Sequence, residues 1–204
     1  LSGSLLIIAL DVTILNVAIP TFQRELSASA ADLQWIINAY ILVFAGLLLT
    51  MGSLGDRFRR RRALQVGLVV FGIASLAAAY SQTSTQLIAA RAFMGVGGAM
   101  IMPSTLSVLV DVFPREERAK AIGIWSAVAA MGVPLGMVLG AWLLEHFWWG
   151  VVFIINTPVV LVVLTAGRVL VPESRDPNPG RIDILGAVLS MGALSTLIYS
   201  LIEA

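Results

Sequence analysis

Uncharged runs of about twenty residues recur along the whole chain and decide what it can fold into. Residues 63–81, for example, contain no charged side chain. A helix of about twenty apolar residues crosses the roughly 30 Å hydrocarbon core of a bilayer. Of all residues, 58% are hydrophobic and 12% are charged, whereas a soluble domain is about a quarter charged. The sequence therefore predicts an all-α integral membrane protein.

Seven apolar segments are predicted as transmembrane helices, and short polar loops join them. They are residues 2–20, 33–53, 63–81, 85–110, 119–143, 149–170 and 183–203.

The stretch before the seventh segment differs from the other loops because it contains three prolines and a glycine, which favour a non-helical linker. We therefore expect a six-helix bundle over 1–170, a cytoplasmic linker over 171–182 and a seventh transmembrane helix over 183–204. A lone helix after a finished bundle also suggests a partial chain.

Basic residues predict the orientation of these segments. The first loop contains only Arg24 and the third has no basic residue. The second, fourth and sixth loops are rich in arginine and lysine, and such loops lie on the cytoplasmic side. The protein is thus expected in the cell membrane with its N-terminus inside. The basic residues of the even-numbered loops are Arg57, Arg59 to Arg62, Arg115, Arg118, Lys120, Arg168, Arg175 and Arg181.

Two charged residues lie well away from the ends of the predicted membrane segments, where charge is costly and usually functional. Asp11 lies in the middle of the first segment, and Arg91 about two turns into the fourth. Asp11 is either a structural carboxylate satisfied by neighbouring helices or a proton- or cation-binding group of a transport pathway. Arg91 needs a carboxylate, backbone carbonyls or a wet cavity. Asp11 suits it chemically, although the sequence shows no contact.

Small residues mark one face of the fifth segment. Gly132, Gly136 and Gly140 are spaced four apart, which lets two helix backbones approach closely. Pro134 lies between them and is compatible with a bend. We interpret this face as a helix-packing surface.

Four further polar or aromatic residues are possible cavity-lining groups. Trp35, Asn38 and Tyr40 lie near the outer end of the second segment, where anchoring at the membrane interface is an equally good interpretation. Asn16 lies about 140° around the helix from Asp11, so the two need not share a face.

The stretch Gly52–Arg62 is predicted to form a turn between two membrane helices. Its Gly-x-x-Gly-Asp-Arg core places the carboxylate of Asp56 beside the guanidinium of Arg57, and such a pair at a helix end is typical of a latch.

Several classes of function find no support in the sequence. It contains no cysteine, one histidine (His146) and no Walker-type phosphate loop. We therefore predict that the protein is not an enzyme, and that it uses no cofactor, metal or nucleic acid.

Four stretches of the sequence, which include the residues discussed above, together resemble motifs of the major facilitator superfamily, in particular of its fourteen-helix drug:proton antiporter branch. Leu10–Pro20 is similar to a first-helix motif, and Gly52–Arg62 to the motif between helices two and three. Leu87–Ala99 resembles the fourth-helix motif and Gly132–Ala141 the antiporter motif. Departures occur at Arg59, Met94, Met137 and Ala141, where the motifs have glycine, glutamine, proline and glycine.

The resemblance implies an N-terminal half of two three-helix repeats, working by alternating access with a C-terminal half that is missing from these residues. It assigns proton and substrate coupling to Asp11 and Arg91, and a cytoplasmic gate to Gly52, Gly55, Asp56, Arg57 and Arg60. The implied partners are the lipid bilayer, protons and a hydrophobic or cationic small molecule. Another substrate class within the superfamily, or a non-transporting membrane half-protein, remains an alternative.

Overall fold

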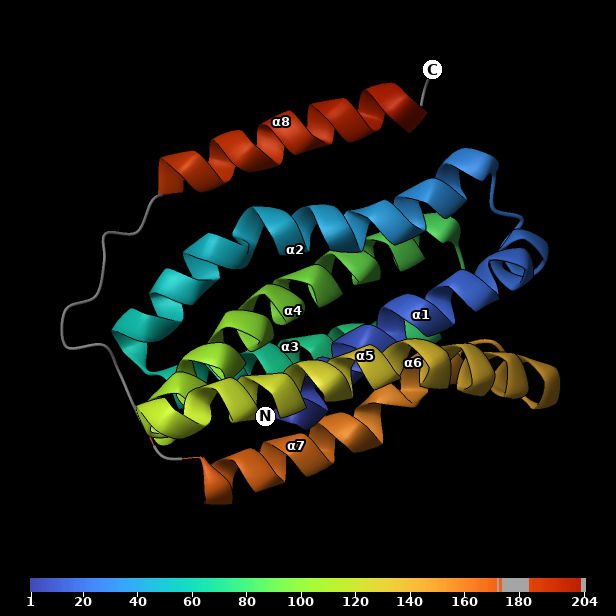
Figure 1. Ribbon diagram of the computed structural model, residues 1–204. Coiled ribbons are helices and arrows are strands. Elements are labelled where there is room, and N and C mark those ends of the chain that lie inside the picture. The colour runs from blue at the N-terminus through green and yellow to red at the C-terminus, as the bar shows by residue number, and fades with distance from the viewer. Residues whose placement is uncertain (172, 174–183, 203–204) are drawn as a thin grey trace.

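The computed structural model describes residues 1–171, 173 and 184–202, and these form helices that run up and down through one bundle (Figure 1). Among these described residues, six helical spans, counting α6 and α7 as one, are long and apolar enough to cross a membrane. The predicted all-α membrane class is confirmed. The helices are α1 (Ser2–Glu25), α2 (Ala30–Phe58), α3 (Arg60–Ala79), α4 (Ser84–Val112), α5 (Arg115–His146), α6 (Val151–Ile154), α7 (Asn156–Leu170) and α8 (Ile184–Ile202).

The first helix continues past the predicted end at Pro20 as far as Glu25. A helix in a bundle tolerates proline when its neighbours supply enough packing. Here Phe22, two residues after Pro20, is fully buried, and its ring lies 5.5 Å from that of Trp149 and 6.2 Å from that of Phe153. Burial of this aromatic cluster favours the continued helix, so the predicted end was wrong.

The predicted turn over Gly52–Arg62 was also wrong in extent. Helix α2 runs through Phe58 and α3 begins at Arg60, so Arg59 alone forms the junction. The backbone of Arg59 has φ 150° and ψ 117°, a region that favours glycine. The family motif has glycine at this position, so the sequence departure coincides with a strained backbone.

The predicted sixth segment consists of two helices that meet at Ile155, whose backbone keeps helical angles (φ −57°, ψ −26°). Helix α6 ends at Ile154, and α7 begins at Asn156. Pro158 explains the junction, because it has no N–H to donate to the carbonyl of Ile154 and its ring crowds that carbonyl.

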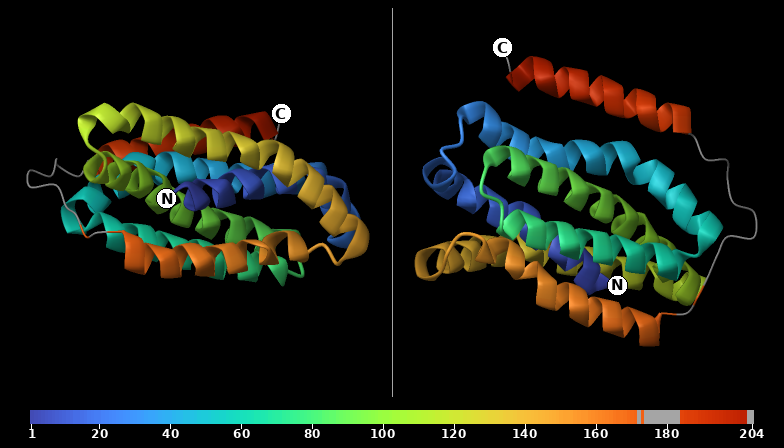
Figure 2. Two further views of the ribbon diagram at one scale, coloured as in Figure 1. Left: turned by 60° about the horizontal axis from the view of Figure 1, so that its bottom comes forward. Right: turned by 180° about the vertical axis from the view of Figure 1, so that it is seen from behind.

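Helices of the two halves of the bundle are interleaved. Helix α1 packs mainly against α5, and α2 mainly against α4, while α3 packs against α4 and α7. In the right view of Figure 2, α4 lies between α2 and α3. This exchange agrees with the expected pair of three-helix repeats, because the first helix of each repeat packs on the second helix of the other.

Helix α8 lies along α2, on the side of the bundle opposite α7 (Figures 1 and 2). The rings of Trp35 in α2 and Tyr199 in α8 lie 6.5 Å apart. Of the predicted linker 171–182, only Val171 and Glu173 belong to the described residues. The boundaries of the bundle, linker and seventh helix therefore stay predictions.

Candidate functional site

The structure brings Asp11 and Arg91 together inside the bundle. Nη1 of Arg91 donates to Oδ2 of Asp11 at 2.5 Å, across 80 residues of sequence. The two residues are only 2% and 1% exposed. They belong to α1 and α4, which are the first helices of the two repeats. A buried acid and base thus join the repeats at their core.

Three further groups surround the guanidinium of Arg91. Nε of Arg91 donates to the carbonyl of Ile36 at 3.3 Å, and the sulfur of Met94 lies 3.8 Å from Nη1. The ring of Tyr40 covers the guanidinium at 4.6 Å, a cation–π distance. Met94 occupies the position where the motif has glutamine, and its sulfur is a weak acceptor. Arg91 is therefore held by α1, α2 and its own helix.

The second oxygen of Asp11 has a partner that the sequence analysis did not identify. Nδ2 of Asn156, the first residue of α7, donates to Oδ1 of Asp11 at 3.2 Å. The same amide donates to Oγ of Ser75 in α3 at 3.0 Å, and this hydroxyl donates to the carbonyl of Phe153 at 2.9 Å. The signal that would have found Asn156 is a polar residue within an apolar segment, as applied to Asp11.

The four residues proposed as cavity-lining groups have different environments. Tyr40 is 2% exposed and contacts the charge pair. Trp35 is half-buried and contacts α8, and Asn38 is half-buried. Asn16 is exposed, and its amide donates to the carbonyl of Val12 one turn earlier. The structure therefore places Tyr40 at the site, and the other three residues elsewhere.

The glycine face of α5 packs directly on the helix that carries Asp11. A Cβ added at Gly132 would lie 2.5 Å from Cβ of Ala9, and one at Gly140 would lie 3.3 Å from Cα of Ile14. Such close approach requires glycine. The face is thus a packing surface against α1, while Pro134 within it is exposed and α5 continues through it.

A second charged cluster lies at the end of the bundle where α2 meets α3. We call this end of the bundle, which contains Arg57 and Arg59 to Arg62, the arginine-rich end. Nε of Arg60 donates to Oδ1 of Asp56 at 2.6 Å, and Nη1 of Arg60 lies 2.6 Å from Oδ2 of Asp111. Arg60 thereby joins the ends of α2, α3 and α4. Asp56 is paired with Arg60, whereas Arg57, its expected partner, is exposed. Asp56 near the end of α2 and Arg60, the first residue of α3, meet across the junction at Arg59.

The two glycines of the same motif allow α2 to pass close to α4. A Cβ at Gly52 would lie 3.3 Å from Cβ of Pro103, and one at Gly55 would lie 3.3 Å from Oγ of Ser104. Their role in the structure is packing, which supports the charged cluster beside them.

Two residues beyond the end of α7, Val171 and Glu173, also contact the arginine-rich end. Glu173 lies 3.2 Å from Nη2 of Arg61 and 3.9 Å from Nη1 of Arg59. Nη1 of Arg61 donates to the carbonyl of Val171 at 3.2 Å. The end of the sixth span is thereby tied to the start of α3.

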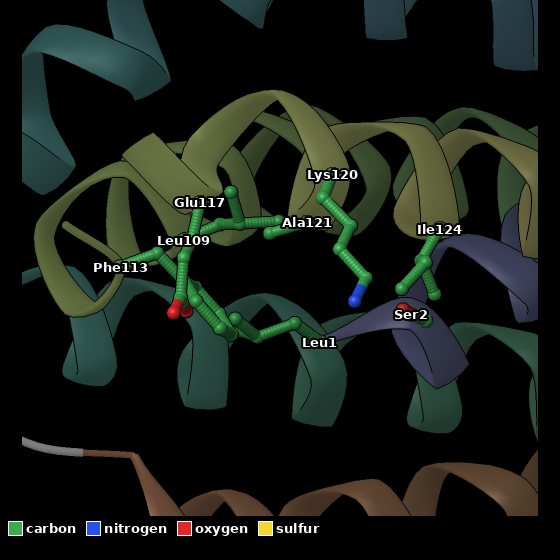
Figure 3. A pocket seen from close by; sticks show the side chains of 8 residues that line it. All are labelled: Leu1, Ser2, Leu109, Phe113, Glu117, Lys120, Ala121 and Ile124. Atoms are coloured by element: carbon green, nitrogen blue, oxygen red, sulfur yellow. The ribbon is translucent and has the colours of Figure 1, made fainter. Parts of the chain in front are cut away.

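A cavity of about 460 Å³ opens at the arginine-rich end, between the start of α1, the end of α4 and the start of α5 (Figure 3). Its charged side chains are Glu117 and Lys120, and most of the rest are apolar, including Leu109, Phe113 and Ile124. Neither Asp11 nor Arg91 lines it, so this cavity and the charge pair are separate features.

A bundle of membrane-crossing helices with an enclosed acid–arginine pair at its core, and a charged cluster at one end, defines a membrane transporter domain. The model of the Major Facilitator Superfamily matches residues 1–201. The chain therefore belongs to the major facilitator superfamily.

Relatives of the chain are drug-efflux and drug-resistance proteins. The chain is 44% identical over 196 residues to the multidrug efflux pump LfrA of Mycolicibacterium smegmatis, which covers 96% of this chain and 39% of LfrA. It is 44% identical over 194 residues to the methyl viologen resistance protein SmvA of Salmonella typhimurium, and the match covers 95% of this chain and 39% of SmvA. The tetracenomycin C resistance and export protein of Streptomyces glaucescens is 40% identical over 200 residues, covering 98% and 37%.

The resemblance to the drug-efflux branch is thus confirmed, and the chain spans about two-fifths of the length of these relatives.

Solved structures show the same fold. The proton:xylose symporter XylE, bound to 6-bromo-6-deoxy-D-glucose, has a TM-score of 0.72 at 19% identity and matches 98% of this chain and 51% of its own. The inward-open xylose transporter XylE of E. coli has a TM-score of 0.68 at 18% identity, and the match covers 98% of this chain and 54% of the XylE chain.

Proposed function

We propose that this chain is part of a proton-coupled exporter of hydrophobic, often cationic, small molecules that works by alternating access. The relatives named for multidrug efflux, methyl viologen resistance and tetracenomycin C export support the substrate class. The observation that carries the coupling is the enclosed Asp11–Arg91 pair. An ionisable pair at the core of a transporter half is a candidate proton-binding site.

The chemistry of the pair supplies a coupling mechanism. A proton on Asp11 neutralises the carboxylate, which leaves the guanidinium of Arg91 buried without its counter-charge. Since an unpaired buried charge is strongly unfavourable, proton binding drives a rearrangement between α1 and α4. A cationic substrate has the same effect, because it competes with Arg91 for the carboxylate.

The arginine-rich end is proposed to face the cytoplasm of a cell (plasma or inner) membrane, since basic loops are retained on that side. With α1 starting at this end, the N-terminus is also cytoplasmic. We propose that Asp56, Arg60 and Asp111 form a gate there, and that the gate closes against the C-terminal half of the same transporter.

The test uses the full-length protein that contains this chain, expressed in cells loaded with tetraphenylphosphonium. Asp11→Asn is expected to abolish efflux driven by a proton gradient. Asp32→Asn is the matched control, because Asp32 belongs to a capping box with Ser29 at the start of α2, away from the pair. Gradient-driven efflux at the wild-type rate by Asp11→Asn would overturn the proposed coupling role.

A further inference from the structure

The carboxylate of Asp11 is held from two sides by hydrogen-bond donors. Oδ2 accepts from Arg91 at 2.5 Å, and Oδ1 accepts from Asn156 at 3.2 Å. Asn156 is 2% exposed and stands at the junction of α6 and α7 in the sixth span. Because both oxygens face N–H groups, this arrangement fits the ionised form of Asp11 and provides no acceptor for a proton on either oxygen.

The hydrogen bonds around Asn156 fix which end of its amide faces Asp11. Ser75 has one hydroxyl hydrogen, and it is donated to the carbonyl of Phe153 at 2.9 Å. The oxygen of Ser75 must therefore accept from Asn156, at 3.0 Å. An amide has two N–H donors, so one is used by Ser75 and the other by Asp11.

A protonated Asp11 requires a different arrangement. Its O–H needs an acceptor, and an N–H cannot provide one. A half-turn of the Asn156 amide about its last rotatable bond exchanges nitrogen and oxygen, and so presents an acceptor to Asp11. We infer that Asn156 is a positioning residue whose amide follows the protonation of Asp11, with nitrogen toward the carboxylate and oxygen toward the carboxylic acid. This inference rests on the proposed proton coupling.

The same half-turn changes the contact between α3 and the sixth span. With the amide oxygen turned inward, Ser75 donates to Asn156 and releases the carbonyl of Phe153. That carbonyl lies in α6, one residue before its end at Ile154. Protonation of Asp11 is thereby transmitted to the junction of α6 and α7 at Ile155, beside the carbonyl of Ile154 that Pro158 leaves without its helical hydrogen bond.

Few other groups influence the charge on Asp11. The phenol of Tyr40 in α2 and the guanidinium of Arg91 in α4 are the titratable groups that face it from the described helices. Ser75 of α3 and Asn156 of α7 are uncharged. Helix α5 packs on α1 through glycines, and its charged residues stand in its first two turns and its last turn.

The experiment measures proton/tetraphenylphosphonium exchange by the purified full-length protein in liposomes, as a function of pH. Asn156→Leu removes the hydrogen bond to the carboxylate as well as the weaker bond to the carboxylic acid. Because the bond to the charged form is the stronger one, the pH midpoint of exchange should rise by about one unit. Asn156→Asp keeps the shape but adds a second carboxyl, so the midpoint should rise further. Thr157→Val is the matched control, because its buried hydroxyl has no partner among the described residues and its midpoint should equal that of the wild type.

Two outcomes overturn the inference. Either Asn156 variant, present in the membrane at wild-type level with a wild-type pH midpoint, contradicts it. A midpoint shift in Thr157→Val as large as in Asn156→Leu also does, because the effect would then be a general one of this turn. Asp11→Asn in the same assay separates the two proposals: if it exchanges like the wild type, the coupling role of Asp11 fails, whereas its inactivity beside an unshifted Asn156→Leu removes only the role of Asn156.

Discussion

Gly136 of α5 faces Thr13 of α1 so closely that a Cβ added to the glycine would lie 2.8 Å from Cβ of Thr13. Thr13 is two residues from Asp11, and its hydroxyl donates to the carbonyl of Ala9 at 2.7 Å, which keeps the side chain on its own helix. The spacing between α1 and α5 therefore sets where Asp11 stands in the bundle.

A larger residue at Gly136 is expected to force the two helices apart. Overpacking of this kind costs about 1–3 kcal/mol, so Gly136→Val should lower the thermal unfolding midpoint of the full-length protein in detergent. Gly123→Ala is the control in the same helix, because a Cβ there meets nothing within 4 Å. Gly123→Ala should be neutral or slightly stabilising, given the better helix propensity of alanine. Equal destabilisation by both variants would contradict the close packing.

The charge pair at the core predicts non-additive mutant stabilities. Asp11→Leu leaves Arg91 buried and unpaired, which costs about 3–5 kcal/mol, and Arg91→Met leaves Asp11 in the same condition. The double variant removes both charges and should be more stable than either single variant. Unfolding midpoints of the four proteins in detergent form the double-mutant cycle. Purely additive losses would mean that the two groups do not stabilise each other.

The strained junction between α2 and α3 predicts a stabilising substitution. Glycine at position 59 adopts the observed backbone without a Cβ clash, so Arg59→Gly should stabilise the protein by about 1–3 kcal/mol. The lost contact with Glu173 is long, at 3.9 Å, and half-exposed, so it offsets little of this gain. Arg59→Ala loses the same contact and retains the strain. Its unfolding midpoint should therefore stay at or below that of the wild type.

The charged cluster at the arginine-rich end predicts a difference between neighbouring arginines. Arg60 bonds two carboxylates, whereas Arg57 is exposed. Arg60→Gln should cost about 1–2 kcal/mol, since charge-assisted bonds are stronger than neutral ones, and Arg57→Gln should be within about 0.5 kcal/mol of the wild type. Drug efflux by the full-length protein should follow the same order. Greater damage from Arg57→Gln than from Arg60→Gln would assign the gate to Arg57 after all.

Span existence was predictable from the sequence, whereas the ends and contacts of the spans were less so. Length and apolarity identified the membrane helices, because lipid imposes that requirement on every one of them. The effect of proline on helix ends was predicted wrongly in two places. Pro20 suggested an end that the packing of Phe22 overrides, while Pro158 marked a junction of two helices that was not predicted.

The two charged residues of the candidate site were predictable from the sequence, whereas their contact and the partner Asn156 were not. Asp11 and Arg91 stood out because charge is rare in apolar segments, and family motifs pointed to both. Their pairing across 80 residues depends on how the helices are interleaved, which periodicity does not encode. The pairing of Asp56 with Arg60 joins the end of α2 to the first residue of α3 across the junction at Arg59, so it depends on a helix boundary that the sequence analysis did not predict.

Interleaved packing also has a consequence for biosynthesis. Helices α1 to α3 leave the ribosome before α4 and α5. The main packing partner of α1 is α5, and the counter-charge of Asp11 is Arg91, which is synthesised 80 residues later. Until then a lone carboxyl must be tolerated in the nascent helix, at a cost of about 2.5–3.5 kcal/mol on insertion scales. The strongly apolar residues flanking Asp11 carry the helix into the bilayer despite that cost. Membrane insertion of α1 therefore precedes assembly of the bundle, because Asp11 enters the bilayer before Arg91 has been synthesised.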